Sequence, residues 1–232
     1  MKGQLFLIPS PLSEGQISDV IPDGTVRAIS ELTHFAVEEI RSARRYLTKA
    51  GFKGKIDMLS FYPINEHTKD EEVRVVIDLL NAGTDVGLIS EAGLPAVADP
   101  GALLVESAHK NGIDVIPLTG PSSIFLALMA SGKNGQNFSF IGYLPAKTEE
   151  RRSKIREIEK LALRSGQSQI IIETPYRNDS LLADFLQICS DETLLTIASE
   201  ITSESQFIKT KRVGEWKKEK PVLNKKPCVF II

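Results

Sequence analysis

Residues 85–101 read DVGLISEAGLPAVADPG, a short apolar run followed by small, turn-forming and acidic residues. The run 85–89 predicts a buried strand. Connections in α/β units usually span about 2 to 6 residues, so the stretch 90–101 is long for a turn alone. Small residues at the carboxyl end of a strand let a ligand approach the backbone. The stretch therefore predicts a ligand-binding loop, with an elaborate turn that binds nothing as the alternative.

The first half of the chain alternates short apolar runs with amphipathic stretches, which predicts a mostly parallel sheet with helices on its faces. A Pro/Gly-rich hinge at 117–121 separates this half from the rest, so we expect domains at 1–116 and 117–232. The strands expected in the first domain are 4–8, 26–29, 56–60, 85–89 and 113–118, and its helices are 39–50, 69–82 and 101–111.

The second half has a different rhythm, which predicts a more mixed sheet. Its expected strands are 138–143, 169–173, 194–199, 206–212 and 228–232, and its expected helices are 122–130, 149–163 and 180–188. The predicted fold class is therefore α/β, with two α/β domains.

Composition excludes several classes of protein. No apolar stretch reaches the roughly 18 residues of a membrane helix, and Pro9 interrupts the first apolar run, so we expect a cytoplasmic protein with no membrane partner. Cys189 and Cys228 have no CxxC or CxxH neighbours, which favours buried thiols over a disulfide framework or a zinc site. The three histidines share no metal-binding spacing. We therefore expect no metal.

Charge is distributed unevenly along the chain. Residues 1–116 carry 11 Lys and Arg against 17 Asp and Glu, whereas residues 117–232 carry 17 against 13. From Ser205 onward eight basic residues face two glutamates, a segment that could attract RNA or form a solvated basic edge. Lys147, Arg151 and Arg152 have the same two interpretations, as phosphate contacts or as partners of the glutamates interleaved with them.

Several common motifs are absent, among them GxGxxG after the first strand, GxxxxGK[ST], HExxH and GxSxG. Other motifs carry a resemblance. They occur in order along almost the whole chain: EEIR (38–41), NE (65–66), SEAGLPAVADPG (90–101), VIPLTGPSS (115–123), GYLPAK (142–147), IETPYR (172–177) and SEIT (199–202). This series resembles the tetrapyrrole methylase superfamily and, within it, the ribosomal RNA small-subunit cytidine ribose 2′-O-methyltransferase family.

The resemblance implies two α/β domains with S-adenosylmethionine in the cleft between them, an RNA substrate and a homodimer. It also implies a set of cofactor-binding positions, several of which a core or capping role would explain equally well. The matching residues are Pro11, Ser90, Glu91, Ala92, Gly93, Val97, Ser122, Ser123, Tyr143, Leu144, Ile201 and Thr202.

Glu38 and Arg41 match a stretch that the resemblance places on the substrate side. Glu38 is the candidate to orient the ribose hydroxyl or accept its proton, and Arg41 the candidate phosphate contact. The alternative is that Glu38 and Glu39 are simply the acidic first turn of a helix. Asp99 is expected to act as the N-terminal cap of the helix after it.

Departures from the family concentrate on the same side. The usual PTPIGNL is PSPLSEG at 9–15, EDTR is EEIR at 38–41, and DAGTP is EAGLP at 91–95. Two alternatives therefore stay open. One is methylation of a tetrapyrrole ring carbon, although the GxGxGD of those enzymes is absent. The other is a noncatalytic protein that binds S-adenosylmethionine or RNA.

Overall fold

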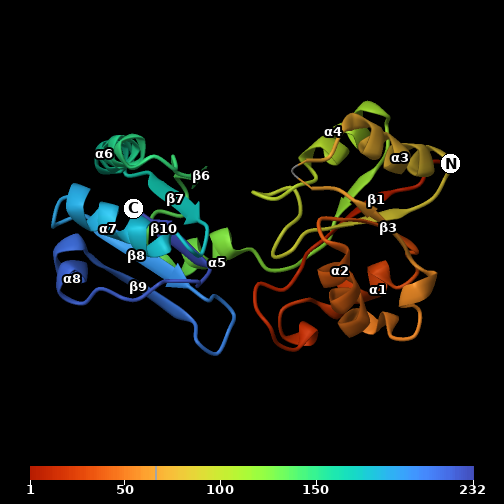
Figure 1. The fold of residues 1–232 in the computed structure, drawn as a ribbon, viewed down its shortest axis with the longest axis horizontal. Coiled ribbons are helices and arrows are strands. Elements are labelled where there is room, and N and C mark those ends of the chain that lie inside the picture. Colours follow the sequence, from red (N-terminus) through yellow and green to blue (C-terminus); the bar gives the residue numbers. More distant parts are fainter. Residues whose placement is uncertain (66) are drawn as a thin grey trace. The chain divides into compact units, whose positions relative to one another are not determined.

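The computed structural model describes residues 1–65 and 67–232, so Glu66 of the NE pair lies outside the described residues. The chain divides into two compact units, Met1–Ser122 and Ser123–Ile232 (Figure 1). This division falls a few residues after the hinge boundary expected from the sequence. Each unit has its own five-stranded sheet.

Unit 1 is built on a parallel sheet, and every strand pairing in it is parallel. At its centre, Gly87 has no room for a side chain: a Cβ there would lie 2.5 Å from Ile8 Cδ1 and 3.0 Å from Phe35 Cδ1. In spatial order the strands are β3 (Ser60–Pro63), β2 (His34–Val37), β4 (Val86–Ile89), β1 (Leu5–Ile8) and β5 (Val115–Pro117).

Helices cover both faces of this sheet, as Figure 1 shows. On one face α3 (Asp70–Asn81) and α4 (Ala102–Lys110) bury apolar side chains at helical spacing, among them Val73, Val76 and Leu104. On the other face α1 (Asp23–Ile29) and α2 (Ile40–Leu47) enclose a second core. The strands are therefore buried on both sides, as their continuous apolar runs predict.

Two strand predictions in unit 1 are wrong. Residues 26–29 belong to α1, where Thr25 and Ile29 share the buried face at helical spacing and Pro22 precedes the first turn. The second strand is instead β2, which was not predicted from the sequence. Residues 56–58 form a short 3₁₀ turn, and the strand expected at 56–60 begins only at Ser60.

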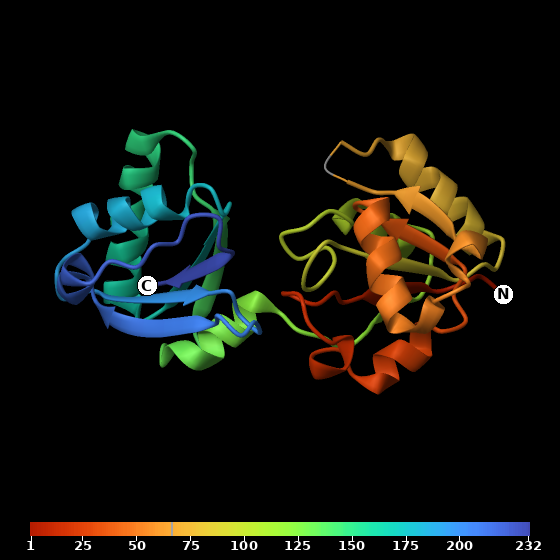
Figure 2. The same ribbon diagram turned by 60° about the horizontal axis from the view of Figure 1, so that its bottom comes forward.

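Unit 2 contains a mixed sheet. Strands β6 and β7 are parallel, and the remaining pairings are antiparallel. In spatial order the strands are β6 (Phe138–Tyr143), β7 (Ser168–Glu173), β10 (Cys228–Ile231), β8 (Leu194–Ser199) and β9 (Phe207–Arg212). The helices are α5 (Ser123–Ser131), α6 (Thr148–Ser165), α7 (Asn178–Ile188) and α8 (Val213–Lys218), and α5 lies on the opposite face of the sheet from α6 and α7 (Figure 2).

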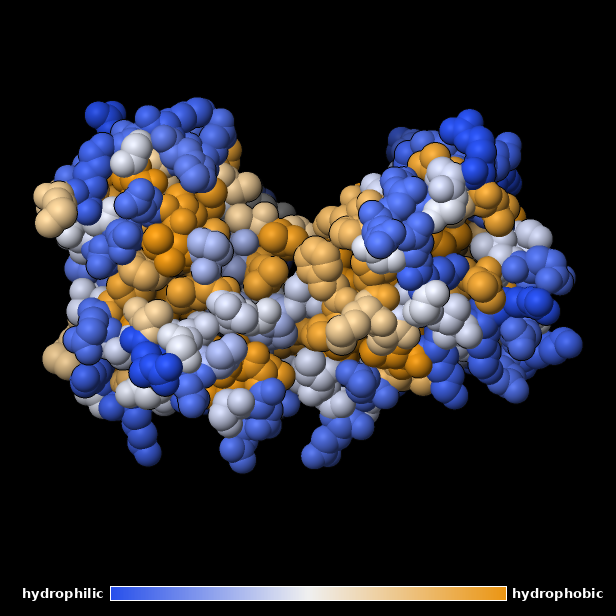
Figure 3. All heavy atoms as spheres, turned by 180° about the vertical axis from the view of Figure 1, so that it is seen from behind, coloured by the Kyte–Doolittle hydropathy of each residue, from blue (hydrophilic) through white to orange (hydrophobic). Residues whose placement is uncertain are grey.

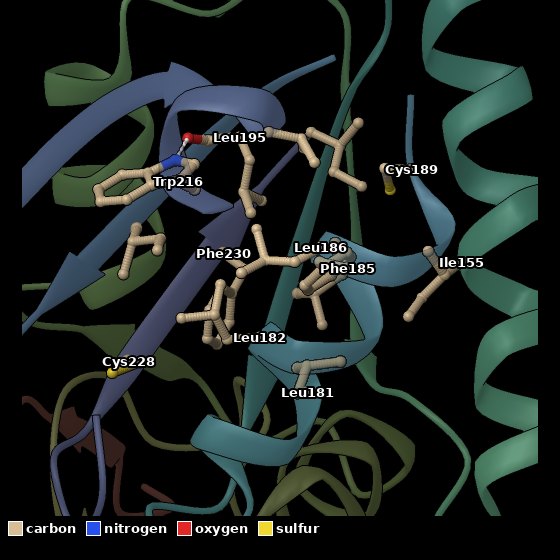
Figure 4. Packing of buried hydrophobic residues seen from close by; sticks show 14 of the residues in the cluster. Ile155, Leu181, Leu182, Phe185, Leu186, Cys189, Leu195, Trp216, Cys228 and Phe230 are labelled. Carbon is tan, nitrogen blue, oxygen red and sulfur yellow. Dashed lines mark hydrogen bonds between the residues drawn. The ribbon is translucent and has the colours of Figure 1, made fainter. Parts of the chain in front are cut away.

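The main core of unit 2 lies between the sheet and helices α6, α7 and α8 (Figure 4). Phe185 of α7 packs on Phe230 of β10 with ring centroids 5.6 Å apart. Trp216 is fully buried, and its indole N–H donates to the Leu195 carbonyl at 2.8 Å. It lies on α8, a six-residue helix that was not predicted from the sequence. Both cysteines are buried, free thiols, as expected.

A buried charge network joins α6 to α7. The Arg151 guanidinium donates to Asp184 at 2.7 Å and to the Ala146 carbonyl at 3.0 Å. Arg152 donates to the other Asp184 oxygen at 2.7 Å. With only 5% of its side chain exposed, Arg151 is not accessible to a nucleic acid, so the phosphate-contact interpretation is wrong for this residue. Its role is to hold two helices together.

Hydrophilic side chains cover much of the surface, with apolar ones among them (Figure 3). Of the helices in the described residues, none combines the length and the apolar run needed to cross a membrane. Residues 1–65 and 67–232 also hold no cluster of metal-ligating side chains.

Candidate functional site

The loop after β4, residues 90–101 and here called the β4 loop, is fixed to the loop after β1 at the carboxyl edge of the unit 1 sheet. Ser10 and Gly93 exchange two backbone hydrogen bonds, of 2.8 and 3.0 Å. The buried Ser10 hydroxyl also donates to the Ser90 carbonyl at 2.8 Å. Tyr46 donates from its hydroxyl to the Pro9 carbonyl at 2.9 Å. The predicted loop therefore has a defined position, set partly by Ser10 and Tyr46, two residues that were not predicted to belong to the site.

The β4 loop has a strained backbone. Gly93 and Gly101 adopt positive φ angles of 78° and 117°, and the alanines Ala96 and Ala98 adopt 63° and 61°. A residue with a Cβ in this region costs roughly 1–2 kcal/mol. Such strain persists only where the surrounding structure imposes it, and it is concentrated at ligand sites and switches. The loop conformation is therefore imposed by its anchors.

The tip of the loop leaves polar backbone groups available. Ala92 is exposed, and within the described part of the chain no hydrogen bond uses its N–H or its carbonyl. Gly93 beside it has little space, since a Cβ there would lie 3.3 Å from Leu12 Cδ2. A ligand can therefore reach the backbone at Ala92 with only a methyl group beside it.

Glu38 and Glu39 have different roles, although they are neighbours in sequence. Glu39 is the N-cap of α2, and its carboxylate accepts the Arg41 and Ser42 N–H groups at 2.8 and 2.7 Å. These two donors hold the pKa of Glu39 below its ordinary value. Glu38 precedes the helix and accepts the Glu91 N–H at 3.3 Å. The helix-cap interpretation thus applies to Glu39, whereas the Glu38 carboxylate contacts the β4 loop.

Ser42 and Asp99 complete a group of polar side chains around Glu91. The Ser42 hydroxyl donates to the Glu91 carboxylate. Burial, and after it the nearby Glu38 carboxylate, raise the pKa of Asp99 to about 6, against a smaller lowering by the Ser90 hydroxyl. The N-cap of α4 is Gly101, so the prediction that Asp99 caps this helix is wrong. Asp99 instead contributes a weakly acidic carboxyl to this edge.

The remaining candidates of unit 1 lie on the same strand ends. Pro11 follows Ser10, Val97 is an exposed residue of the β4 loop, and Ser122 follows β5. The chain after β5 approaches the chain after β1 closely, since a Cβ on Gly120 would lie 2.3 Å from the Pro9 side chain. The structure therefore brings the ends of β1, β2, β4 and β5 together.

The candidates of unit 2 lie at one end of its own sheet. Tyr143 ends β6, Leu144 follows it, and Ile201 and Thr202 follow β8. The strand register places the ends of β6, β7 and β8 at the same edge, with the start of β10 between β7 and β8. Leu144 and Ile201 are buried, so only their backbones can face a ligand. Ser123 begins α5.

The basic C-terminal segment is partly neutralised within unit 2. Four of its eight basic residues form ion pairs with acidic residues. Lys211 also lies over the Trp216 ring at 5.2 Å from its centroid. The pairs are Lys211–Glu219, Arg212–Glu192, Lys217–Asp191 and Lys226–Glu200. A solvated, self-paired edge therefore describes this segment better than a polyanion-binding surface.

Comparison with known proteins assigns the chain to a family. A family model described as Tetrapyrrole (Corrin/Porphyrin) Methylases matches residues 21–217. The ribosomal RNA small subunit methyltransferase I of Vibrio cholerae is 31% identical over 214 residues, which cover 91% of this chain and 69% of that protein. The protein of the same name from Haemophilus influenzae is 28% identical, over 100% of this chain and 79% of the relative.

A solved structure agrees at the level of the fold. It is the uroporphyrin-III C-methyl transferase of Thermus thermophilus complexed with S-adenosyl homocysteine. Its TM-score is 0.60 at 16% identity, and the match covers 99% of this chain and 96% of that one.

Proposed function

This chain belongs to the tetrapyrrole (corrin/porphyrin) methylase family and is an S-adenosylmethionine-dependent methyltransferase, and we propose that it methylates a ribose 2′-hydroxyl of ribosomal RNA. The family resemblance from the sequence is thereby confirmed. The observation that carries the proposed substrate is the similarity, along nearly the whole chain, to methyltransferases named for small-subunit ribosomal RNA. We also propose that the protein is cytoplasmic.

The β4 loop fits S-adenosylmethionine. The free N–H and carbonyl of Ala92 suit a ligand with an amino acid end and ribose hydroxyls, and Gly93 keeps the approach clear of side chains. When bound, the cofactor supplies an electrophilic methyl group on a sulfonium. We assign Ser90, Glu91, Ala92, Gly93 and Val97 to the methionine and ribose parts, with Pro11 of the β1 loop beside them.

Five residues of unit 2 and Ser122 complete the proposed cofactor-binding set. Tyr143 is exposed and can pack against a base, whereas buried Leu144 and Ile201 can contribute only backbone groups. The residues assigned to the adenosine are Ser122, Ser123, Tyr143, Leu144, Ile201 and Thr202.

The proposed chemistry on the RNA side uses Glu38. A ribose hydroxyl is a weak nucleophile, and a positioned carboxylate that takes its proton accelerates displacement. The Glu91 N–H holds the Glu38 carboxylate beside the β4 loop. Because alignment of the reacting groups supplies much of the rate, we expect this hydrogen bond to contribute to catalysis. Exposed Arg41, in the first turn of α2, contacts a phosphate in this proposal.

We also propose a homodimer. Phe125 and Met129 of α5 are 53% and 76% exposed, although the helix is apolar almost throughout. A helix that is apolar on all sides is normally buried. A second copy of the chain would cover these side chains.

Titration calorimetry with S-adenosylhomocysteine tests the cofactor site. Gly93→Val should weaken binding at least about tenfold, because the added side chain meets Leu12 and β-branched residues avoid positive φ. Gly51→Val is the matched control: it introduces the same backbone strain at φ 102° but in open space, and should bind as wild type does. Equal weakening by both variants would contradict the assignment.

Transfer of labelled methyl groups to small-subunit ribosomal RNA tests the reaction. Glu38→Gln should lose at least about a hundredfold in kcat. Glu39→Gln, which keeps an oxygen acceptor at the cap, should retain most of the activity. Cofactor binding by the wild type without transfer to any ribosomal RNA would favour the noncatalytic alternative.

A further inference from the structure

More than half of the basic residues of unit 1 lie in one short stretch. Six of the 11 Lys and Arg residues of 1–116 fall within residues 40–56, a stretch that contains no Asp or Glu. The rest of 1–116 holds all 17 acidic residues of that half. The six residues are Arg41, Arg44, Arg45, Lys49, Lys53 and Lys55. The segment 40–56, here called the basic segment, is therefore a cationic island on an acidic unit.

The basic segment comprises α2, the turn after it and the loop to Ile56. It borders a shallow hollow of about 530 Å³ that Arg41, Arg44 and Arg45 line. Ile40 and Ile56 add apolar surface to the same hollow, and Thr48 and Glu39, whose carboxylate caps α2, complete its lining. Cations around an apolar floor suit a ligand with negative charges and flat or apolar parts, such as a nucleotide chain.

Most of these cations have no acidic partner. Arg44 pairs with exposed Asp57 at 2.5 Å and lies 5.9 Å from the centroid of the Phe61 ring. Lys49 reaches only the Gly15 carbonyl, at 3.5 Å. Across residues 1–65 and 67–232, no acidic side chain forms an ion pair with Arg45, Lys53 or Lys55. The fold therefore leaves the charge of the basic segment available.

The helix does not need these cations for its own stability. Glu39 caps it, and Ala43, Tyr46 and Leu47 bury its inner face. Arg41 and Arg45, and likewise Arg45 and Lys49, are four residues apart, a spacing at which like charges destabilise a helix. A polyanion would relieve this repulsion, which favours a binding role over a structural one.

We propose that the basic segment binds the sugar-phosphate backbone of the RNA substrate next to the methylated nucleotide. This inference rests on the proposed function and names the surface that function requires. Alpha-helix α2 begins directly after Glu38 and Glu39, so a backbone bound along it passes the carboxylate assigned to the ribose hydroxyl. Arg45 and Lys49 are the residues that bind phosphates in addition to Arg41.

The test is the binding of fluorescein-labelled small-subunit ribosomal RNA to the full chain over a series of KCl concentrations. Arg45→Gln/Lys49→Gln should weaken binding at least about tenfold at 0.1 M KCl. It should also reduce the slope of log K against log[KCl] by about 2, one for each lost phosphate contact. Its KM for RNA should rise with little change in kcat, and its Tm should not fall.

A matched double variant on α6 is the control. Arg156 and Lys160 are exposed and four residues apart, like Arg45 and Lys49, so Arg156→Gln/Lys160→Gln removes the same charge elsewhere. It should bind RNA as wild type does. An equal loss in both double variants, or wild-type affinity and slope in the Arg45/Lys49 variant, would overturn the proposal.

Binding without turnover separates this inference from the proposed function. RNA binding that depends on the basic segment, without methyl transfer by the wild type, would support the surface and remove the proposed reaction. Methyl transfer by the wild type that the Arg45/Lys49 variant leaves unchanged would support the proposed reaction and remove the proposed RNA-binding surface. Failure of the wild type to bind the RNA would overturn both.

Discussion

Helices α2 and α6 both carry clusters of arginines, and the structure uses them in opposite ways. On α6, Arg151 is 5% exposed and shares Asp184 with Arg152. On α2, Arg45 is exposed and makes no ion pair within the described residues. The difference lies in what faces each helix: α6 packs against α7, which supplies the buried carboxylate of Asp184, while the ion pair of Arg44 on α2 is with the exposed Asp57.

The comparison separates structural from functional charge. A buried arginine must be paired, because an uncompensated charge costs several kcal/mol. An exposed one costs little to leave alone. Exposed arginines that repel one another on one helix therefore indicate a binding role more reliably than arginines counted along the sequence.

The largest effect should come from breaking the α6 network. Arg151→Ala leaves the buried Asp184 with only Arg152, and we expect the free energy of unfolding to fall by about 3 kcal/mol. Urea denaturation measures it. Arg156→Ala, on the exposed face of the same helix, is the control and should change little. Similar stability in the two variants would break the comparison.

The stability of α2 should depend on its N-cap, Glu39, and not on its arginines. Glu39→Ala removes the acceptor for the Arg41 and Ser42 N–H groups, so we expect Tm to fall by about 2–4 °C. Arg45→Ala should leave Tm within about 1 °C. Calorimetric scans of both variants make the measurement, and a larger loss for Arg45→Ala would show that the arginine holds the helix.

The pH dependence of stability gives a further prediction, at Asp99. Asp184 is paired with arginines, whereas Asp99 lies near Glu38 and Glu91 and has a pKa of about 6, above its ordinary 3.8. A raised carboxyl pKa means that folding favours the protonated form. The contribution of Asp99 to the free energy of unfolding is therefore full below about pH 4 and is lost as the pH rises to about 6.

Asp99→Asn cannot ionise and should remove this loss. Discounting for its partial exposure, we expect the variant to gain roughly 1 kcal/mol over wild type at pH 8 compared with pH 4. Denaturation at the two pH values measures the gain. An equal difference in stability between Asp99→Asn and wild type at pH 4 and pH 8 would contradict the raised pKa of Asp99.

The smallest effect should come from Asp57, the acidic residue that forms an ion pair with Arg44 of α2. Asp57 is 92% exposed, so Asp57→Ala should change stability by less than about 0.5 kcal/mol. It also frees Arg44, so RNA affinity should rise about twofold at 0.1 M KCl. Fluorescence anisotropy with labelled RNA measures it, and a lower affinity would show that the Arg44–Asp57 pair presents the arginine productively.

Long periodic segments were predictable from the sequence, and short ones were not. The helix expected at 69–82 is α3 at Asp70–Asn81, and the strand expected at 194–199 is β8 at Leu194–Ser199. The prediction of a strand at 26–29 failed because four residues, of which Val26, Ala28 and Ile29 are apolar, do not distinguish a strand from one helical turn. There the packing of Thr25 and Ile29 decides the structure.

For the candidate site, the sequence predicted the loop after β4 but not which side chains share it. The Ser10–Gly93 pairing joins residues more than 80 positions apart, and no local pattern indicates it. Arg151 failed for the same reason, because its partner is on another helix while glutamates at pairing distance lie on its own. Contacts distant in sequence decide which charges remain available.

Trp216 has a practical consequence for spectroscopy. It is the only tryptophan of the chain, and it is buried in unit 2 on the inner side of α8, where its indole N–H donates to the Leu195 carbonyl. Its emission therefore reports on the unit that contains the α6–α7 network and does not directly report on the unit that contains the β4 loop and α2. Fluorescence would detect the unfolding of Arg151→Ala, whereas local damage from Gly93→Val or Glu39→Ala needs circular dichroism or an added probe.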